Sequence, residues 1–291
     1  MYNSAKMCTF AAPLHDSILS DLVMNFRTVV DIPRPPFQIE PLEELLFVGS
    51  CFADSIGRRF AEEHFPVTVN PYGVMYNPAS VMHSVQQWLV SQEGEGAPRI
   101  TFLTLGTNHV YRLRETGEIV DNCQKRPHHL FIEEQLSVAA CLDFLAKAVD
   151  ALTSLRADVQ VVVTVSPIRY AKYGFHGSQL SKATLLLAAD ELCRRCPCVT
   201  YFPAYELVND ELRDYRFYQP DMLHPSQQTV DYIWERLSET FLSPHAKQFV
   251  EEWKPIKAAL NHKPFHPDSE DYQKFLAQTK EKENQLLSRY I

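Results

Sequence analysis

The sequence predicts an α/β fold in which a mostly parallel sheet is covered on both faces by helices. Apolar runs of strand length alternate with segments of helical periodicity along the chain, as in successive βαβ units. The run 161–165 is unbroken and rich in β-branched residues, as expected of a central parallel strand. Polar or small residues also follow several of these runs, where the carboxyl ends of parallel strands would gather them: Ser50, Cys51, Gly73, Asn108 and Ser166.

The first half of the chain predicts alternating short strands and helices. Ile56, Phe60 and Ala61 fall on one helical face, and Val81, Val85, Trp88 and Leu89 fall on another. Strands are expected at 45–48, 67–69 and 100–105, and helices at 53–64 and 78–90. A small hairpin is expected from 110–113 and 118–120, around Thr116-Gly117.

The second half continues this alternation. Val138, Leu142, Leu145, Val149 and Leu152 share one face of a long helix predicted at 133–154. A glycine-containing loop is expected at 173–178, a helix at 180–193 and a strand at 199–202. Pro225 suits the first position of a further helix that runs to about residue 241.

Three regions are expected along the chain. Residues 1–24 form an N-terminal extension, and residues 25–260 hold the α/β domain. Residues 261–291 form a helical tail, because the composition from Asp268 onward is charged, free of glycine and prone to helix. The joint at 260–267 contains two prolines.

Composition narrows the class of protein. The 291 residues are 45% hydrophobic and 11% aromatic, enough for a large core. The formal net charge of -8, without a basic stripe, argues against a nucleic-acid partner. No apolar run approaches the roughly 18–20 residues that span a bilayer, and no secretory signal is recognisable, so a cytoplasmic protein is expected. Seven cysteines, an odd number, suit reduced thiols.

The segment around Gly49 has the form of a nucleophile turn. A buried strand ends at this glycine, Ser50 and Cys51 follow, and a helix comes next. The turn exposes a side chain, and the free N–H groups of a helix N-terminus stabilise negative charge. Serine would need a base to remove its proton, whereas a helix N-terminus or a protonated histidine lowers the pKa of cysteine. One of the two is expected to be the nucleophile and the other structural.

Asp221-x-x-His224 supplies the groups that such a nucleophile needs. His224 would accept the proton, and Asp221, one turn earlier, would orient the imidazole. His224 is expected at the N-cap of the following helix, with Asp221 one turn before it. Together with the nucleophile turn, the pair predicts acyl-transfer chemistry.

Further candidates would complete the site. Gly73, by its backbone N–H, and Asn108, by its side-chain amide, are candidate oxyanion donors. Ser166, Arg169 and His109 are candidate substrate-binding residues, with Arg169 either binding an anionic substrate group or pairing with a carboxylate. No metal or cofactor is expected, because neither the histidines nor the cysteine cluster has a complete ligand set: His109, His128, His129, Cys193, Cys196 and Cys198.

At these residues the sequence resembles the GSCFA family, named for the motif at 49–53. The resemblance covers roughly 25–260, and members typically begin near the equivalent of Met24, which implies that 1–23 is an upstream misassigned start. Its other motifs are NPYGVMYNP (70–78), LGT (105–107), NCQK (122–125), VSPIR (165–169), YGF (173–175), SK (181–182), ELRDYRFY (211–218) and DMLHP (221–225).

The family is in turn similar to the SGNH/GDSL hydrolases. That resemblance implies a flavodoxin-like, three-layer α/β/α sandwich, shared by esterases, lipases and carbohydrate acetyl-esterases. Carried over residue by residue, Gly73 and Asn108 take the oxyanion roles, and Asp221 with His224 forms the last block.

Two positions depart from the SGNH pattern. The usual Gly-Asp-Ser is here Gly49-Ser50-Cys51. A gap-free match makes Cys51 the nucleophile, and a one-residue slip makes it Ser50. We favour Cys51. His109 stands where the group often has aspartate, which weakens the match at Asn108.

Three functions fit these residues. The first is hydrolysis of an acyl ester, such as a small O-acyl group on a carbohydrate or metabolite. The second is acyl transfer to a sugar or other acceptor, with coenzyme A as one donor, which a cysteine nucleophile would suit. The third is ligand binding on the same fold without turnover.

Overall fold

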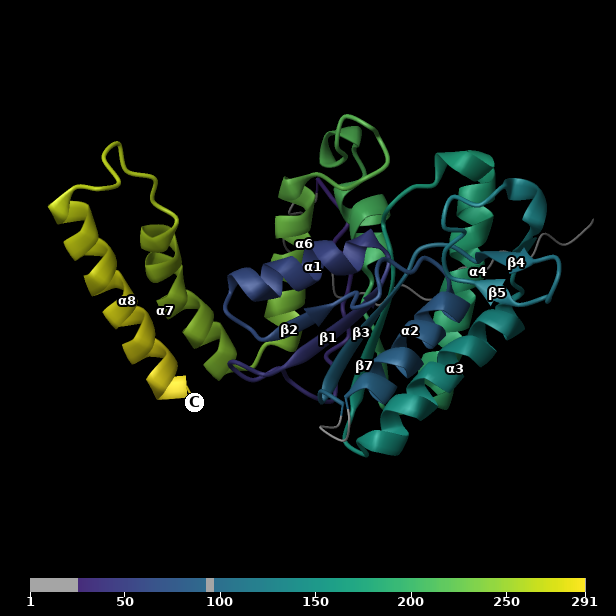
Figure 1. Cartoon of the computed structure of the whole chain (residues 1–291), viewed down its shortest axis with the longest axis horizontal. Helices are drawn as coiled ribbons and strands as arrows, with labels where there is room; N and C mark the ends of the chain where they lie inside the picture. The colour runs from purple at the N-terminus through teal and green to yellow at the C-terminus, as the bar shows by residue number, and fades with distance from the viewer. Residues whose placement is uncertain (1–25, 93–96, 291) are drawn as a thin grey trace, which may run out of the picture.

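A five-stranded parallel sheet forms the centre of the computed structural model, which describes residues 26–92 and 97–290. The strand order is β2-β1-β3-β7-β8, and every neighbouring pair is parallel (Figure 1). The strands are β1 (Leu45–Gly49), β2 (Val67–Val69), β3 (Ile100–Leu105), β7 (Gln160–Val165) and β8 (Val199–Tyr201). The predicted parallel sheet is confirmed. The extension expected at 1–24 lies outside the described residues.

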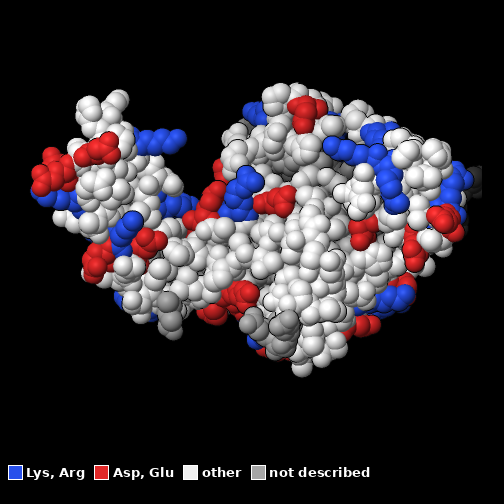
Figure 2. All heavy atoms as spheres, viewed as in Figure 1, with Lys and Arg blue, Asp and Glu red and all other residues white. Residues whose placement is uncertain are grey.

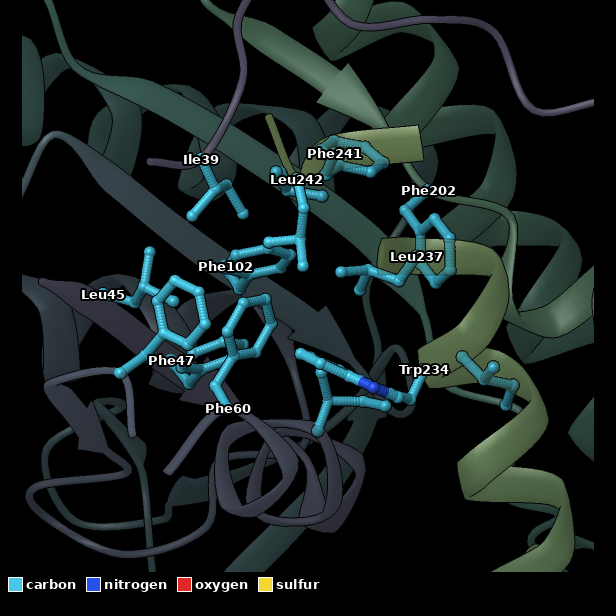
Figure 3. Close-up of a cluster of buried hydrophobic side chains, with 14 of the residues drawn as sticks. Ile39, Leu45, Phe47, Phe60, Phe102, Phe202, Trp234, Leu237, Phe241 and Leu242 are labelled. Carbon is cyan, nitrogen blue, oxygen red and sulfur yellow. The ribbon is translucent and has the colours of Figure 1, made fainter. Parts of the chain in front are cut away.

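Helices cover both faces of this sheet and give three layers. One face is covered by α2 (Pro78–Ser91), α3 (Val138–Leu155) and α4 (Gly174–Arg195), and the other by α1 (Cys51–Glu62) and α6 (Gln227–Phe241). On the α1 side, Phe47 and Phe102 stack with ring centroids 4.5 Å apart, and Phe60 meets Trp234 edge to face at 4.7 Å (Figure 3). The α/β/α sandwich implied by the resemblance is confirmed.

Beyond β3 the chain forms a small antiparallel sheet of order β5-β4-β6. Strand β4 (His109–Leu113) pairs with β5 (Ile119–Val120), as the predicted hairpin requires, and with β6 (Phe131–Gln135). The helix predicted at 133–154 therefore begins too early. Glu133 pairs with Tyr111 in the sheet, and Ser137 caps the helix by accepting a hydrogen bond from the Ala140 N–H.

Two other predicted boundaries are wrong. The loop expected at 173–178 is the first part of α4, whose helix begins at Gly174. Pro225 is not the first residue of α6, and His224 is not its N-cap. Ser226 takes that place, because its side chain accepts a hydrogen bond from the Thr229 N–H.

The chain ends in a helical hairpin, α7 (Pro244–Leu260) and α8 (Glu270–Tyr290), joined by the proline-containing segment. Trp253 Nε1 donates to the Glu62 carbonyl oxygen at 2.9 Å, and Lys257 Nζ bonds the buried Glu63 carboxylate at 2.6 Å. These bonds attach α7 to the end of α1. In Figure 2 the hairpin carries charges of both signs and is separated from the body by a notch. None of the described helices is long and apolar enough to cross a membrane.

Candidate active site

The turn between β1 and α1 is fixed by contacts with Asn70 and with Thr104 on β3. Gly49 has φ +142°, and a Cβ there would collide with the carbonyl oxygen of Thr104 on β3. Its N–H donates to Asn70 Oδ1 at 2.8 Å. Ser50 is fully buried, its N–H donates to the Thr104 carbonyl at 3.0 Å, and its Oγ lies 3.0 Å from Thr104 Oγ1. Ser50 therefore faces the sheet and caps α1 by accepting from the Phe52 N–H at 3.3 Å.

Cys51, the first residue of α1, lies on the side of the predicted base. Its Sγ is 4.0 Å from His224 Nε2. The other ring nitrogen, Nδ1, lies 2.6 Å from Asp221 Oδ2. Asp221 Oδ1 also accepts the N–H groups of Leu223 at 2.8 Å and His224 at 3.0 Å. These backbone bonds, followed by the contact with the imidazole, lower the pKa of Asp221 to about 2, so the carboxylate stays charged and fixed.

The pKa of the Cys51 thiol is raised, whereas the sequence predicted that it would be lowered. Burial raises its pKa, and this effect outweighs the lowering by a hydrogen bond from the Tyr76 hydroxyl. The expected lowering at a helix N-terminus is therefore not what the environment produces. A thiol with a raised pKa needs a base to become a nucleophile, and His224 Nε2 is the group that faces it.

A buried lysine lies behind the site. Lys182, on α4, is fully buried, and its Nζ donates to the carbonyl oxygens of Gly106 and Ser166, both at 2.7 Å. These carbonyls follow the carboxyl ends of β3 and β7, so the ammonium group joins two central strands. Burial lowers the pKa of Lys182 to about 7, while the neighbouring Cys51 acts in the opposite direction.

Two tyrosines lie between Cys51 and this lysine. The Tyr170 ring is 5.3 Å from Lys182 Nζ and meets the Tyr76 ring edge to face at 6.0 Å. The Tyr76 carbonyl accepts the N–H groups of Gly106 and Thr107, both at 2.8 Å. The Tyr170 hydroxyl is buried and has no hydrogen-bond partner among the described residues, and burial raises its pKa.

The two candidate oxyanion donors both have partners within the chain. The Gly73 N–H donates to the Asn70 carbonyl oxygen at 2.8 Å and closes a turn. The Asn108 amide donates to the Leu136 carbonyl oxygen at 2.8 Å, where Asn108 precedes β4 and Leu136 follows β6. Their oxyanion roles stay predictions. The Cys51 N–H, at the first position of a helix, has no intrahelical acceptor and is a further candidate donor.

The three candidate substrate-binding residues are placed differently from one another. Arg169 Nη1 donates to the Met222 carbonyl oxygen at 2.9 Å, next to the His224 loop. Ser166 is fully buried, and its Oγ accepts the Ile168 N–H at 3.3 Å. His109 is buried against the Tyr173 ring, stacked at 3.6 Å, and burial lowers its pKa. Of these three side chains, that of Arg169 contacts the loop that carries His224.

Sequence reasoning identified Cys51, Asp221 and His224 but missed Tyr76 and Lys182 as neighbours of the site. Both occur in motifs of the family resemblance, and that occurrence was the available signal. Nothing in a lone lysine on an otherwise ordinary helix predicts complete burial. Among the described residues, no group of three His, Cys, Asp or Glu side chains is placed to hold a metal ion.

Solved structures with a similar chain path include a lipolytic protein and carbohydrate esterases. A lipolytic G-D-S-L family member from Veillonella parvula is 14% identical over 68% of this chain and 97% of its own, with a TM-score of 0.44. A carbohydrate esterase of family 3 from Talaromyces cellulolyticus is 10% identical over 72% and 98%, with a TM-score of 0.42. A family 2 carbohydrate esterase from Corynascus thermopiles is 13% identical over 70% and 67%, with a TM-score of 0.45. At this level the likenesses carry no weight for the reaction.

Sequence comparison is more decisive. No curated protein matched the chain. The model described as "GSCFA domain protein, C-terminal domain" matches residues 253–291, a segment that begins inside α7 and includes α8. The model of the GSCFA family matches residues 44–98 and 96–237, from β1 to within α6, and thus includes Cys51, Asp221 and His224. The chain belongs to the GSCFA family.

Proposed function

We propose that this protein hydrolyses acyl esters with Cys51 as nucleophile. The observation that carries the proposal is the line of contacts from Cys51 Sγ to His224 Nε2, at 4.0 Å, and from His224 Nδ1 to Asp221 Oδ2, at 2.6 Å. A nucleophile, a base and a group that orients the base are the three parts of a catalytic triad. Ser50 lacks this relation, because its hydroxyl is bonded to Thr104 inside the fold.

The reaction would proceed in two steps. Cys51 Sγ gives its proton to His224 Nε2 as the sulfur–carbon bond forms, and the ester carbon–oxygen bond breaks. The departing oxygen takes the proton from His224 and leaves as an alcohol. Water then adds to the thioester, with its proton passing through His224 to the Cys51 sulfur, and a carboxylic acid is released. The Cys51 N–H and the Tyr76 hydroxyl, both adjacent to Cys51 Sγ, would be the donors to the developing oxyanion.

The substrate class proposed here is a small O-acyl ester, on a carbohydrate or another metabolite. An acyltransferase is the second candidate, and the thiol nucleophile favours it, because an acyl thioester exchanges readily with other acceptors. The two functions share the first step. They differ in whether water or an added alcohol receives the acyl group, which product analysis in the presence of glycerol would distinguish.

The test combines turnover with labelling. Hydrolysis of 4-nitrophenyl acetate should be lost in Cys51→Ala and His224→Ala and retained in Cys196→Ala, which removes a half-buried cysteine elsewhere. Peptide mapping after treatment with iodoacetamide should find His224-dependent alkylation of Cys51. A fluorophosphonate adduct on Ser50, or unchanged hydrolysis in Cys51→Ala, would refute the assignment. Absence of both turnover and selective labelling would favour a binding protein.

A further inference from the structure

A pocket of about 250 Å³ lies beside the loop that carries the catalytic pair. One wall is formed by Arg169 and Tyr218, which also hold that loop. The Arg169 N–H donates to the Leu223 carbonyl oxygen at 3.0 Å, and Tyr218 forms a β-bridge with Pro225. Because Leu223 and Pro225 flank His224, two residues of the pocket wall are bonded to the loop that carries the proposed base.

Arg169 presents a positive charge to this pocket. Its guanidinium lies over three aromatic rings, with 4.1 Å to the centroid of Phe175, 5.5 Å to Tyr218 and 5.8 Å to Tyr215. One of its nitrogens donates to the Met222 carbonyl oxygen, and no carboxylate of the described residues lies within salt-bridge distance of it. Two roles were predicted for Arg169, pairing with a carboxylate or binding an anionic substrate group. Because no carboxylate partner is found among the described residues, we favour the second role.

A second arginine lines the same pocket in a strained conformation. Arg213 has φ 43° and ψ 36°, the left-handed region that side chains with a Cβ rarely adopt. It ends the π-helical segment Leu207–Leu212, a rare geometry that is frequent at functional sites. The carboxylate in the lining, Asp214, is bonded to Arg216 at 2.9 Å, so it does not neutralise Arg213. Strain of this kind persists where the surroundings impose it, and it clusters at ligand-binding sites.

Apolar and aromatic side chains that are open to solvent lie around Arg169, and Tyr215 among them lines the pocket. The side chains of Phe175 and Tyr215 are 51% and 68% exposed, and that of Met222 is 44% exposed. Neither Arg169 nor Arg213 has a carboxylate partner in the part of the chain that the structure describes, so this pocket holds two cationic side chains on a chain of net charge -8. Planar guanidinium groups bind carboxylate and phosphate oxygens through paired hydrogen bonds.

We propose that Arg169 and Arg213 bind an anionic group of the substrate, a carboxylate or a phosphate, while its ester reaches Cys51. This inference rests on the proposed function, since it names the class of ester that the site accepts. Tyr215 in the lining, and Phe175 beside Arg169, would contact the apolar part of the same molecule. Arg169 also holds the loop before His224, so Arg213 is the cleaner position for a test.

Three acetate esters that share an acetoxyphenyl group test whether the charge of the substrate, rather than its shape, determines the rate of cleavage. They are methyl 4-acetoxybenzoate, which is neutral, 4-acetoxybenzoate, which carries a carboxylate, and 4-acetoxyphenyl phosphate. Steady-state kinetics at pH 7.5 would be measured for the wild type, Arg213→Gln and Arg114→Gln. The last is a matched control, because it removes the same charge from an exposed side chain that lies outside the pocket lining and has no ion pair among the described residues.

We expect the wild type to prefer at least one anionic ester over the neutral one in kcat/KM. Arg213→Gln should reduce this preference about five- to tenfold, the size of one lost charged hydrogen bond at a partly exposed site, and Arg114→Gln should not. The larger of the two anionic preferences identifies carboxylate or phosphate as the ligand. No preference in the wild type, or an equal loss in both variants, would overturn the proposal.

A binding measurement separates this proposal from the proposed function. If the wild type cleaves none of the esters, or cleavage survives Cys51→Ala, the assigned reaction is wrong, but the pocket can still be tested. Titration calorimetry with benzoate and with phenyl phosphate should then show binding to Cys51→Ala that is weakened by adding Arg213→Gln. Absence of binding by both anions would refute the pocket independently of catalysis.

Discussion

Replacement of Lys182 by methionine tests the charge buried behind the site. Methionine has similar length and is apolar, but it leaves the Gly106 and Ser166 carbonyls without this donor. In the folded chain the pKa of Lys182 is about 7 because of burial, whereas the unperturbed value is 10.5. Between these two pH values the unfolded chain binds one proton more than the folded chain. The stability of the wild type therefore rises with pH in this window, by about 1.4 kcal/mol per pH unit at most.

The size of the effect follows from the two pKa values. Over the whole window of 3.5 pH units, from 7 to 10.5, Lys182 contributes a change of about 5 kcal/mol. Between pH 6 and pH 9, where a protein is easily handled, the expected change is about 2–3 kcal/mol. Lys182→Met removes this change. The free energy of unfolding of the variant, relative to that of the wild type, should therefore be highest at pH 6 and lower by about 2–3 kcal/mol at pH 9.

Urea unfolding at constant ionic strength measures this difference. The free energy of unfolding would be determined at pH 6, 7, 8 and 9 for the wild type, Lys182→Met and Lys147→Met. Lys147 is a matched control, since it also lies on a helix but its side chain is 54% exposed. A constant difference between the wild type and Lys182→Met at all four pH values would refute the reasoning. It would mean that the two carbonyl bonds keep the lysine charged despite its burial.

The remaining predictions concern the catalytic pair, the thiol and the tail. Asp221→Asn should lower kcat/KM for 4-nitrophenyl acetate at least about a hundredfold, because an amide no longer favours the imidazolium of His224; an unchanged rate would exclude the orienting role. Tyr76→Phe removes a donor to sulfur and should raise the pH of half-maximal alkylation of Cys51, followed by mass spectrometry; an unmoved profile would contradict this hydrogen bond. Leu286→Ala, at a side chain 1% exposed, should cost about 2–4 kcal/mol in urea unfolding, and a loss below about 1 kcal/mol would show that α8 is loosely packed.

The central sheet was predictable from the sequence because its strands are continuous apolar runs. Strands β2 and β3 have the predicted bounds, and β1 and β7 differ by one residue. Strand β6 was not predictable in this way. Glu133 and Glu134 alternate poorly with apolar residues, and their strand exists through pairing with β4, which a local pattern does not contain.

The contacts among Cys51, His224 and Asp221 were predictable from the sequence, and the surroundings of these residues were less so. The spacing of Asp221 and His224 indicated that the carboxylate contacts the imidazole. The tight turn after Gly49 indicated that a nucleophile stands at the start of α1. The choice between Ser50 and Cys51 depends on which side chain faces the sheet. A shift of one residue along the turn would exchange the two, and the sequence does not define the turn to within one residue. The raised pKa of Cys51 arises from burial by residues distant in sequence, so no motif could have indicated it.

The attachment of the C-terminal hairpin has a consequence for synthesis of the chain. Helix α1 begins at Cys51, and its far end is bonded to α7 through Glu62 and Glu63. Leu286, on α8, belongs to the same apolar cluster as Phe60. Helix α1 is thus made before α7 and α8, and its packing is complete only after α8 has emerged from the ribosome. Ribosome-bound chains stalled before α8 would hold Cys51, Asp221 and His224 without the support of a finished core.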